Sequence, residues 1–196
     1  FPFTNYDYNS LHYSESVKFI NLGPLRFKEI KLKGNKIETL IKRLLRRILL
    51  LLFEYPDIEL MFKVSKCLKN RGGFDLIISI AVPYPIHWGV ARARSDNHRI
   101  GRTWVADCGD PYMGCRTDSF NKLFYFKNVE KWFCRKADYI SVPNQDHLGQ
   151  YYPEFIQKMK IIPQGFCFED SKISETQIVH EMPTFAFAGV LLKEKR

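Results

Sequence analysis

The sequence has no long hydrophobic run: among its 196 residues, the longest uninterrupted stretch, residues 48–53, has only six. A membrane-spanning helix needs about 20 apolar residues, so none is predicted. Residues 1–8 are aromatic and polar, without the basic start and apolar core of a signal peptide. The five cysteines are scattered, odd in number and without a C-x-x-C pair, which favours reduced thiols and a cytoplasmic protein.

Internal repeats and low-complexity tracts are also missing. Hydrophobic residues make up 45% of the chain, aromatic residues 15% and charged residues 26%. This composition excludes a disordered chain and a coiled coil. It provides enough apolar material for the core of one large domain, or of one domain and part of a second.

The net charge of +9 is concentrated in one segment. Residues 18–71 contain 14 basic and five acidic residues, which alone gives +9, whereas the rest of the chain balances 16 basic against 16 acidic residues. The positive field therefore belongs to one part of the molecule, where it can serve one local purpose.

This basic segment contains the clearest helical pattern. Apolar residues recur at helical spacing over residues 37–52, and the opposite face carries Lys42, Arg43, Arg46 and Arg47. Two interpretations stay open: the helix contacts an anionic membrane surface, or it packs its apolar face on the core and leaves the basic face in solvent. A second helix is predicted over 57–70, and short strands over 17–22 and 25–32.

From residue 74 onward, strands and helices are predicted to alternate. Residues 74–81 are almost continuously apolar, as in a parallel strand that is buried on both faces. The alternation predicts an α/β fold: a doubly wound, Rossmann-like parallel sheet with helices on both faces. The further strands are expected at 103–107, 138–142 and 160–163, and the helices at 86–94, 119–136 and 144–157.

The end of the sequence predicts the beginning of a second domain. Residues 184–192 read as another buried strand, and the preceding residues are polar and loop-like. We therefore expect a first domain over 1–164, a linker over 165–182, and over 183–196 the first strand of a truncated second domain.

Polar side chains follow three of the predicted strands. His87 comes after the strand at 74–81, Asp107 and Asp110 come at and after the end of the next one, and Gln164 follows the strand at 160–163. In open α/β sheets ligands bind at the carboxyl ends of the strands, so we expect these residues at a cleft. The alternatives are that His87 begins a helix and that Asp110 forms a turn before Pro111. Cys108 and Cys115 are interpreted as ordinary thiols, because zinc would need two more nearby ligands.

Five motifs then occur in a characteristic order: S-x-x-x-P-x-P-x-H, W-V-A-D-x-x-D-P-Y, A-D-Y-I-S-V-P, K-I-I-P-Q-G-F and F-A-F-A-G-V-L. Over residues 74–191 this order resembles the amino-terminal half of a GT-B glycosyltransferase of the retaining family-four group. The chain departs from the family pattern at several positions. Gly109 stands where the family often has Arg, Tyr112 where it has Trp, and Gln164 and Cys167 where it has Asn and Asp.

The resemblance implies transfer of a sugar, with retention, from a nucleotide-sugar co-substrate to a glycan or lipid-linked acceptor. It implies no metal and no tightly bound cofactor. It places the donor site, with its paired-glutamate motif, mainly in the second domain, so that these residues alone are expected to be inactive. It also implies attachment to the inner membrane face through the basic helix. His87 and Asp110 are the expected catalytic residues, and the expected substrate contacts are Pro85, Asp107, Gly109, Tyr112, Gln164 and Gly165.

The alternative function is a non-catalytic basic α/β module that binds nucleic acid or an anionic membrane surface. Proteins that bind nucleic acid usually interleave basic residues with exposed aromatic ones. The basic helix instead offers aliphatic residues at helical spacing. The glycosyltransferase hypothesis is therefore preferred, and no nucleic-acid partner is expected.

Overall fold

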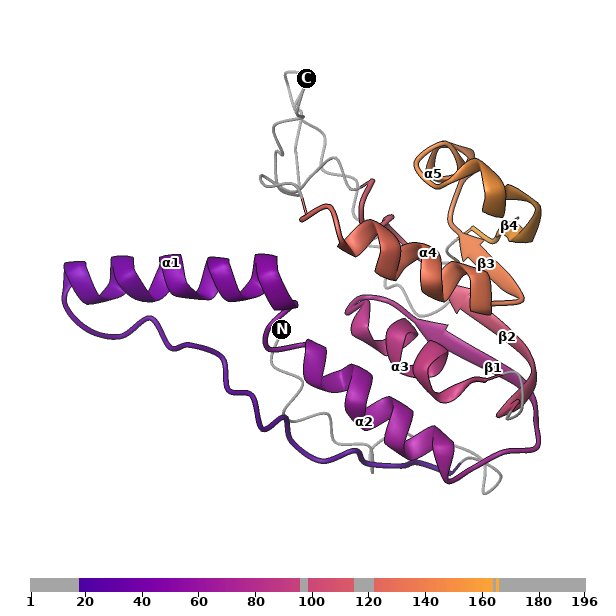
Figure 1. Ribbon diagram of the computed structural model, residues 1–196, viewed down its shortest axis with the longest axis horizontal. Helices are drawn as coiled ribbons and strands as arrows, with labels where there is room; N and C mark the ends of the chain where they lie inside the picture. Colours follow the sequence, from indigo (N-terminus) through magenta and orange to yellow (C-terminus); the bar gives the residue numbers. More distant parts are fainter. Residues whose placement is uncertain (1–17, 96–98, 115–121, 164, 166–196) are drawn as a thin grey trace, which may run out of the picture.

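The computed structural model describes residues 18–95, 99–114, 122–163 and 165 (Figure 1). The predicted linker and second-domain strand, residues 165–182 and 183–196, lie outside the described residues apart from Gly165. The elements are, in order, α1 (Lys36–Phe53), α2 (Ile58–Lys69), β1 (Phe74–Ile80), α3 (Pro85–Ala93), β2 (Gly101–Asp107), α4 (Phe126–Lys136), β3 (Tyr139–Val142), α5 (Gln145–Leu148), the 3-10 helix η2 (Pro153–Lys158) and β4 (Met159–Ile161).

The four strands form one parallel sheet in the order β1-β2-β3-β4. This confirms the predicted α/β class and the four parallel strands after residue 74. The order is sequential, so each crossover moves to the next strand in the same direction. Parallel crossovers share one hand, and successive crossovers therefore place their helices on the same face of the sheet.

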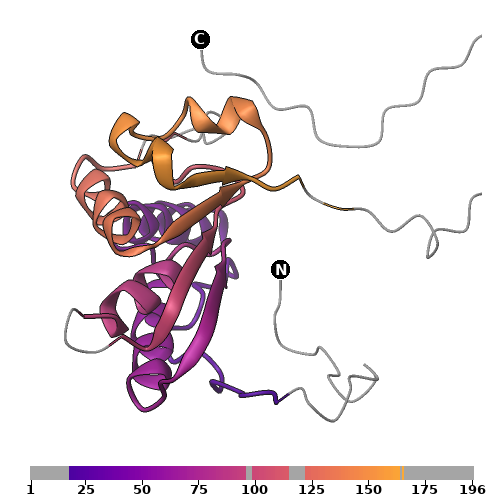
Figure 2. The ribbon, with the colours of Figure 1, turned by 90° about the vertical axis from the view of Figure 1, so that its right-hand side faces the viewer.

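Figure 2 shows this arrangement, with α2, α3 and α4 together on one side of the sheet. The prediction of helices on both faces is therefore wrong for the described part of the chain. The apolar run in β1 is likewise covered on one face only. Ser79 is buried towards the helices, whereas Leu76, Ile78 and Ile80 are exposed on the opposite face, Ile78 by 58%.

The core lies between the sheet and its helices. Its largest fully buried side chains include Trp88 from α3, Trp104 from β2 and Phe133 from α4. Helices α2 and α3 approach closely at Gly89, where an added Cβ would lie 2.7 Å from the Cβ of Val64. A side chain at position 89 would therefore hold the two helices apart.

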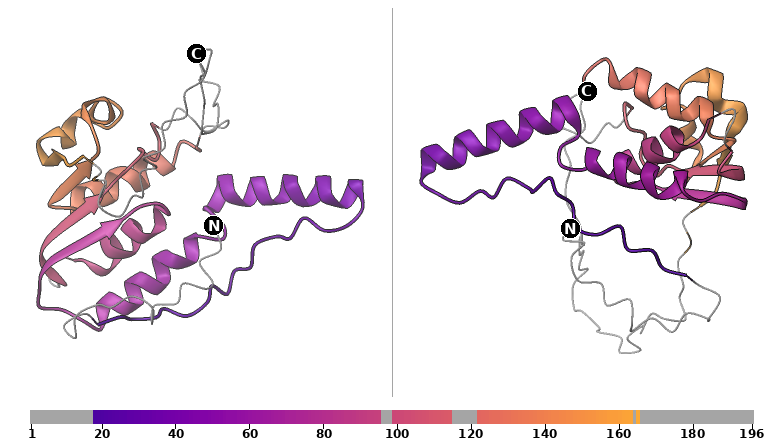
Figure 3. Two further views of the ribbon diagram at one scale, coloured as in Figure 1. Left: turned by 180° about the vertical axis from the view of Figure 1, so that it is seen from behind. Right: turned by 60° about the horizontal axis from the view of Figure 1, so that its bottom comes forward.

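Helix α1 matches its prediction, but its surroundings do not fit a core helix. None of its residues is buried, and its apolar face is open to solvent, with Leu40 67% and Leu44 62% exposed. Figures 1 and 3 show α1 extending away from the sheet and the other helices. The core-facing interpretation of this helix is therefore wrong in this structure.

The strands predicted over 17–22 and 25–32 are absent from residues 18–33, which run as irregular backbone beside α2 (Figure 3). The side chains of α2 hold this segment. Lys63 Nζ donates to the carbonyls of Leu22, Gly23 and Pro24, and Glu59 accepts from the N–H of Phe27. These bonds satisfy backbone groups that a strand would have paired with a neighbouring strand.

The helix predicted over 144–157 is divided into α5 and η2. Gly149 follows the last residue of α5, and Pro153 begins η2. Proline has no N–H to continue a helical ladder and fits the first helical turn, so both residues favour a break here. For α4, the described helix begins at Phe126 rather than at residue 119, and residues 115–121 lie outside the described residues.

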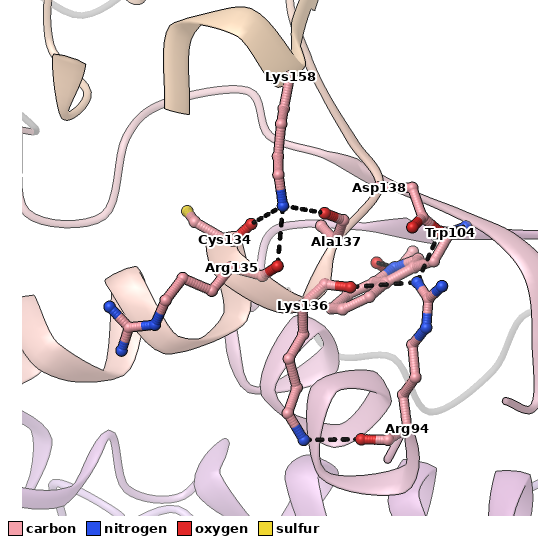
Figure 4. A network of polar contacts seen from close by, with 9 residues as sticks. Arg94, Trp104, Cys134, Arg135, Lys136, Ala137, Asp138 and Lys158 are labelled. Atoms are coloured by element: carbon pink, nitrogen blue, oxygen red, sulfur yellow. Dashed lines mark hydrogen bonds and ion pairs between the residues drawn. The ribbon is translucent and has the colours of Figure 1, made fainter. Parts of the chain in front are cut away.

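The C-terminal end of α4 is held by Lys158 (Figure 4). Lys158 Nζ donates to the carbonyls of Cys134, Arg135 and Ala137, groups that have no partner within the helix. Cations are also favoured at this end by the helix dipole.

In the same network, Arg94 pairs with Asp138 at 2.7 Å, and Asp138 also accepts from the N–H of Trp104 at 2.8 Å. Partial burial raises the pKa of Asp138, but the bonds to Arg94 and Trp104 outweigh burial and keep its pKa below the ordinary value. These charges stabilise the fold and are not free to bind a ligand.

Candidate functional site

The carboxyl ends of the strands meet at one edge of the sheet, which we call the carboxyl edge. In the parallel register, Asp107 at the end of β2 lies beside Ile80 of β1 and Ser141 of β3. Its Oδ1 accepts a hydrogen bond of 2.6 Å from Ser141 Oγ. The carboxylate is half-buried and keeps further lone pairs for other donors. The predicted position of Asp107 at the carboxyl edge is confirmed.

Asp110 lies in the loop after β2, and its side chain is 70% exposed. Its Oδ1 lies 3.3 Å from Nε2 of His147, a residue of α5. The other ring nitrogen of His147, Nδ1, lies 2.6 Å from Oδ1 of Asn144. That oxygen also accepts from the backbone N–H of His147, which fixes the orientation of the amide. Both ring nitrogens of His147 thus face oxygen atoms of neighbouring side chains.

His87 lies elsewhere, with none of its surface exposed to solvent. It belongs to α3, and its ring stacks on Phe133 at 5.3 Å between centroids. Burial lowers the pKa of His87 to about 4, and a hydrogen bond with the Asp107 backbone opposes burial only in part. The expectation that His87 lines a cleft is therefore wrong in this structure, because the ring is enclosed by the core.

Two polar side chains face the nitrogens of the His87 ring. The indole N–H of Trp104 donates to Ser79 Oγ at 2.8 Å, and the same oxygen lies 2.7 Å from His87 Nδ1. The other ring nitrogen, Nε2, lies 3.5 Å from Cys108 Sγ. Burial also raises the pKa of Cys108 to about 12, so the pair is a neutral imidazole beside a neutral thiol.

Two expected substrate contacts, Pro85 and Tyr112, are also buried. Pro85 occupies the first turn of α3, where its missing N–H costs nothing. The hydroxyl of Tyr112 donates to Glu54 at 2.6 Å, and burial together with the negative charge of Glu54 raises the pKa of the phenol. Both residues support the fold, and their predicted place on a binding surface is wrong in this structure.

The remaining expected contacts are glycines and Gln164. Gly109 is half-buried beside Asp110, and an added Cβ there would meet no atom within 4 Å. Gly165 is exposed and equally free of close neighbours. Gln164 lies outside the described residues. The two glycines therefore leave open space near the ends of β2 and β4.

A buried carboxylate, that of Glu130, holds the loop that carries Asp110. Its Oε1 accepts from the N–H of Tyr112 at 3.0 Å, and its Oε2 accepts from the Tyr152 hydroxyl at 2.7 Å. Burial raises the pKa of Glu130, and these hydrogen bonds oppose that effect. Glu130 thus connects α4, the loop after β2 and the segment before η2.

Sequence reasoning missed His147, Asn144 and Ser141 at the carboxyl edge. The signal was present, because the predicted strand 138–142 is followed closely by N-Q-D-H. An Asn before a short helix is a typical N-cap, and its side chain here accepts from the third residue of the following turn. The same strand-end rule that selected Asp107 and Asp110 also applies to these residues.

On α1, Arg43 is exposed, and Arg46 pairs with Glu29 at 2.6 Å. Lys42 lies 3.8 Å from Glu38 and donates to the carbonyl of Lys33. Arg47 is half-buried. Solvent-exposed ion pairs of this kind contribute little to stability, so the exposed Arg43 and Arg46 can still meet an anionic partner.

Two features of the described residues limit the chemistry. They contain no cluster of three or more His, Cys, Asp or Glu side chains that could hold a metal ion. Among the same residues, no helix combines the length and the apolar content that a membrane crossing requires. Cys67, Cys108 and Cys134 are free thiols, as expected.

Comparisons of the chain with protein-family models, with curated proteins and with solved structures find no match. The geometry described above therefore carries the functional argument together with the sequence motifs.

Proposed function

We propose that the chain is the acceptor-side half of a retaining GT-B glycosyltransferase, which transfers a sugar from a nucleotide-sugar donor to a glycan or lipid-linked acceptor. One observation carries the proposal. The carboxylates of Asp107 and Asp110, both in the W-V-A-D-x-x-D-P-Y motif, lie at the carboxyl edge of a parallel sheet. This edge is where α/β proteins bind their ligands.

In this proposal Asp107 and Asp110 bind the acceptor. Sugars present many hydroxyl groups, and ionised carboxylates accept strong hydrogen bonds from them. Asp110 is the exposed member, so it contacts the reacting acceptor hydroxyl. His147 is a positioning residue, because its Nε2 holds Asp110 Oδ1 from the side of α5. His147 is thus the histidine at the proposed site, where the sequence predicted His87.

The donor half of the reaction belongs to a second domain under this proposal. The phosphates of the nucleotide sugar would be stabilised there by basic residues and a helix N-terminus, without a bound metal. Closure of the two domains would bring donor and acceptor together away from bulk water. Residues 1–196 alone would then bind nucleotide sugars negligibly.

A second candidate function, binding to an anionic membrane surface, is favoured by α1. Its exposed apolar face carries Leu40 and Leu44, and its basic residues include the exposed Arg43. An amphipathic helix of this kind lies in the membrane interface with its apolar side in the acyl region. The two functions are compatible, because a lipid-linked acceptor would be met at the membrane. The protein would then be cytoplasmic and peripheral at the inner membrane face.

The first test is calorimetric titration of residues 1–196 with a panel of UDP- and GDP-sugars. Negligible binding is expected. Stoichiometric binding would place the donor site in these residues and refute the domain assignment.

The second test measures sugar transfer by the longer, two-domain protein that the proposal implies. Asp110→Asn and His147→Gln should each lower kcat/KM on the order of 10- to 100-fold, because the acceptor hydroxyl loses its oriented partner. The matched control is Asp146→Asn, since Asp146 is exposed on the same short helix but lies outside this hydrogen-bonded chain. Equal losses in all three variants, or no transfer at all, would refute the proposed site.

A further inference from the structure

A hollow of about 590 Å³ lies between α2 and the irregular segment that runs beside it, residues 20–27 (Figure 3). Its volume is within the range of small-molecule sites. Four large apolar side chains line it, each between 38% and 46% exposed: Ile20, Leu22, Phe27 and Phe62. They are therefore within reach of a ligand that enters from solvent.

Hydrogen bonds from α2 fix the two walls of the hollow relative to each other. Lys63 Nζ donates to the three carbonyls of residues 22–24, and the Glu59 carboxylate accepts from the N–H of Phe27. Lys63 and Glu59 also lie 3.5 Å apart, so their opposite charges offset each other. The hollow is therefore formed without a ligand, and the charges of these two side chains are already used.

The other charged side chains of the lining are all positive. Arg26 comes from the irregular segment, and Lys66 and Arg71 come from α2 and the residues after it; all three are exposed. Within the described part of the chain, no carboxylate pairs with any of them. Arg71 donates to Cys67 through one guanidinium nitrogen only, which leaves its other N–H groups available. Both walls thus carry positive charge without a matching anion.

This combination of charge and apolar surface defines the class of ligand. Like charges around one hollow repel one another, and an anion between them removes that repulsion. Arg92 of α3 adds to the positive field, because its guanidinium carbon lies 5.0 Å from the centre of the Phe62 ring. Carboxylate and phosphate groups accept charge-assisted hydrogen bonds from Arg and Lys. The apolar side chains require an aliphatic body next to that group, which inorganic phosphate and nucleotide sugars lack.

We propose that this hollow binds an aliphatic chain that carries one terminal anionic group. The chain lies against the four apolar side chains, and the anionic group lies between Arg26 and Lys66. A fatty acid and a single-chain lipid with a phosphate head share this chemistry.

The site is independent of the proposed glycosyl transfer. Asn70 and Arg71 line the hollow and come shortly before Phe74, the first residue of β1, so the hollow lies towards the amino ends of the strands. The carboxyl edge, with Asp107 and Asp110, is at the opposite end of the sheet. The hollow is also separate from the apolar face of α1, because no residue of α1 lines it.

The test is calorimetric titration of residues 1–196 in about 150 mM NaCl, where distant surface charges are screened. The probes are octanoate, octyl phosphate and uncharged octanol, all below the concentrations at which they form micelles. At least one of the two anions should bind saturably, with one molecule per chain. It should bind at least roughly 10-fold more tightly than octanol. The anion with the higher affinity then identifies the head group as a carboxylate or a phosphate.

Arg26→Gln and Lys66→Gln should each weaken binding of this anion and leave the affinity for octanol unchanged. The expected loss is about 3- to 10-fold for each, because both side chains are exposed and water weakens their attraction for an anion. The matched control is Lys69→Gln, which removes the same charge from an exposed lysine of α2 outside the lining. It should change the affinity by less than about 2-fold.

Leu22→Asn tests the apolar part of the site. It should weaken binding of the anion and of octanol alike, because it removes apolar surface that both use. Leu22 is exposed in the free protein, so the unfolding midpoint should stay unchanged.

Three outcomes would overturn the proposal. They are the absence of saturable binding of either anion, equal affinities for the anion and octanol, and equal effects of Lys66→Gln and Lys69→Gln. Binding that is lost in Leu44→Asp and kept in Leu22→Asn would also overturn it, because the probes would then occupy the apolar face of α1.

Discussion

Acidification should destabilise this protein through His87, and replacing His87 with glutamine should remove that contribution. The native ring is fully buried and neutral, and its Nδ1 is occupied by the Ser79 hydroxyl. A second proton would place a charge in the core, where burial disfavours it. In the unfolded chain the ring regains its ordinary proton affinity.

The magnitude follows from the pKa of His87, which burial lowers from 6.5 to about 4. Between these two values the unfolded chain binds a proton that the folded chain does not bind. The free energy of unfolding therefore falls as the pH falls, by about 1.4 kcal/mol per pH unit across this interval. Between pH 7 and pH 4 the loss amounts to about 3 kcal/mol, a substantial share of the stability of a typical domain.

The assay is urea-induced unfolding, followed by circular dichroism at half-unit steps from pH 7.5 to pH 4. The glutamine of His87→Gln does not bind a proton in this range. Between pH 7 and pH 4, the free energy of unfolding of the variant should therefore fall by about 3 kcal/mol less than that of the unaltered protein. The contributions of the other four histidines and of the carboxylates cancel in the comparison. Parallel profiles would refute the reasoning. So would an NMR titration in which the His87 ring gains its proton near pH 6.5.

Two further predictions concern packing and the surface. Gly89→Ala should lower the free energy of unfolding by about 1–3 kcal/mol, because the new Cβ would meet Val64. The control Gly109→Ala, with open space around it, should change the free energy of unfolding by less than about 0.5 kcal/mol. Equal effects of the two variants in chemical denaturation would contradict the close approach of α2 and α3. Leu44→Asp should weaken co-sedimentation with phosphatidylglycerol vesicles at least roughly 10-fold while leaving the unfolding midpoint unchanged, because Leu44 is exposed on the free protein. Unchanged sedimentation would exclude the apolar face of α1 from membrane contact.

The strands and most helices could be predicted from the sequence because their signals are local. Helical spacing defines α1, and the alternation of apolar runs with helical segments defines β1, β2 and β3. The failures came from tertiary context. A run such as that in β1 shows that a strand is apolar, but it does not show which face another layer covers. Strand order decides that coverage, and it cannot be read from one strand at a time.

The candidate site was predicted in part, for a similar reason. Asp107 and Asp110 could be placed at the carboxyl edge from their position after a strand. His87 follows a strand as well, but Pro85 starts α3 so early that the histidine falls on the helix face that packs against Ser79 and Phe133. His147 was overlooked because its helix was expected to run unbroken to residue 157. The pairing of His147 with Asp110 joins two segments that are 37 residues apart in the chain. A single sequence does not show which of its distant residues come into contact.

Glu54 joins two parts of the molecule that the sequence keeps far apart. It ends α1 in a left-handed conformation, with φ 52°, and its buried carboxylate accepts from the Tyr112 hydroxyl and from Lys122 Nζ. The end of α1 and the loop that carries Asp110 are therefore expected to move together. A force that pulls α1 outward must either break both bonds, leaving a charge buried without a partner, or carry the loop along with it. The stiffness of the carboxyl edge is thus set partly by the bonds that fix the attached end of a projecting helix.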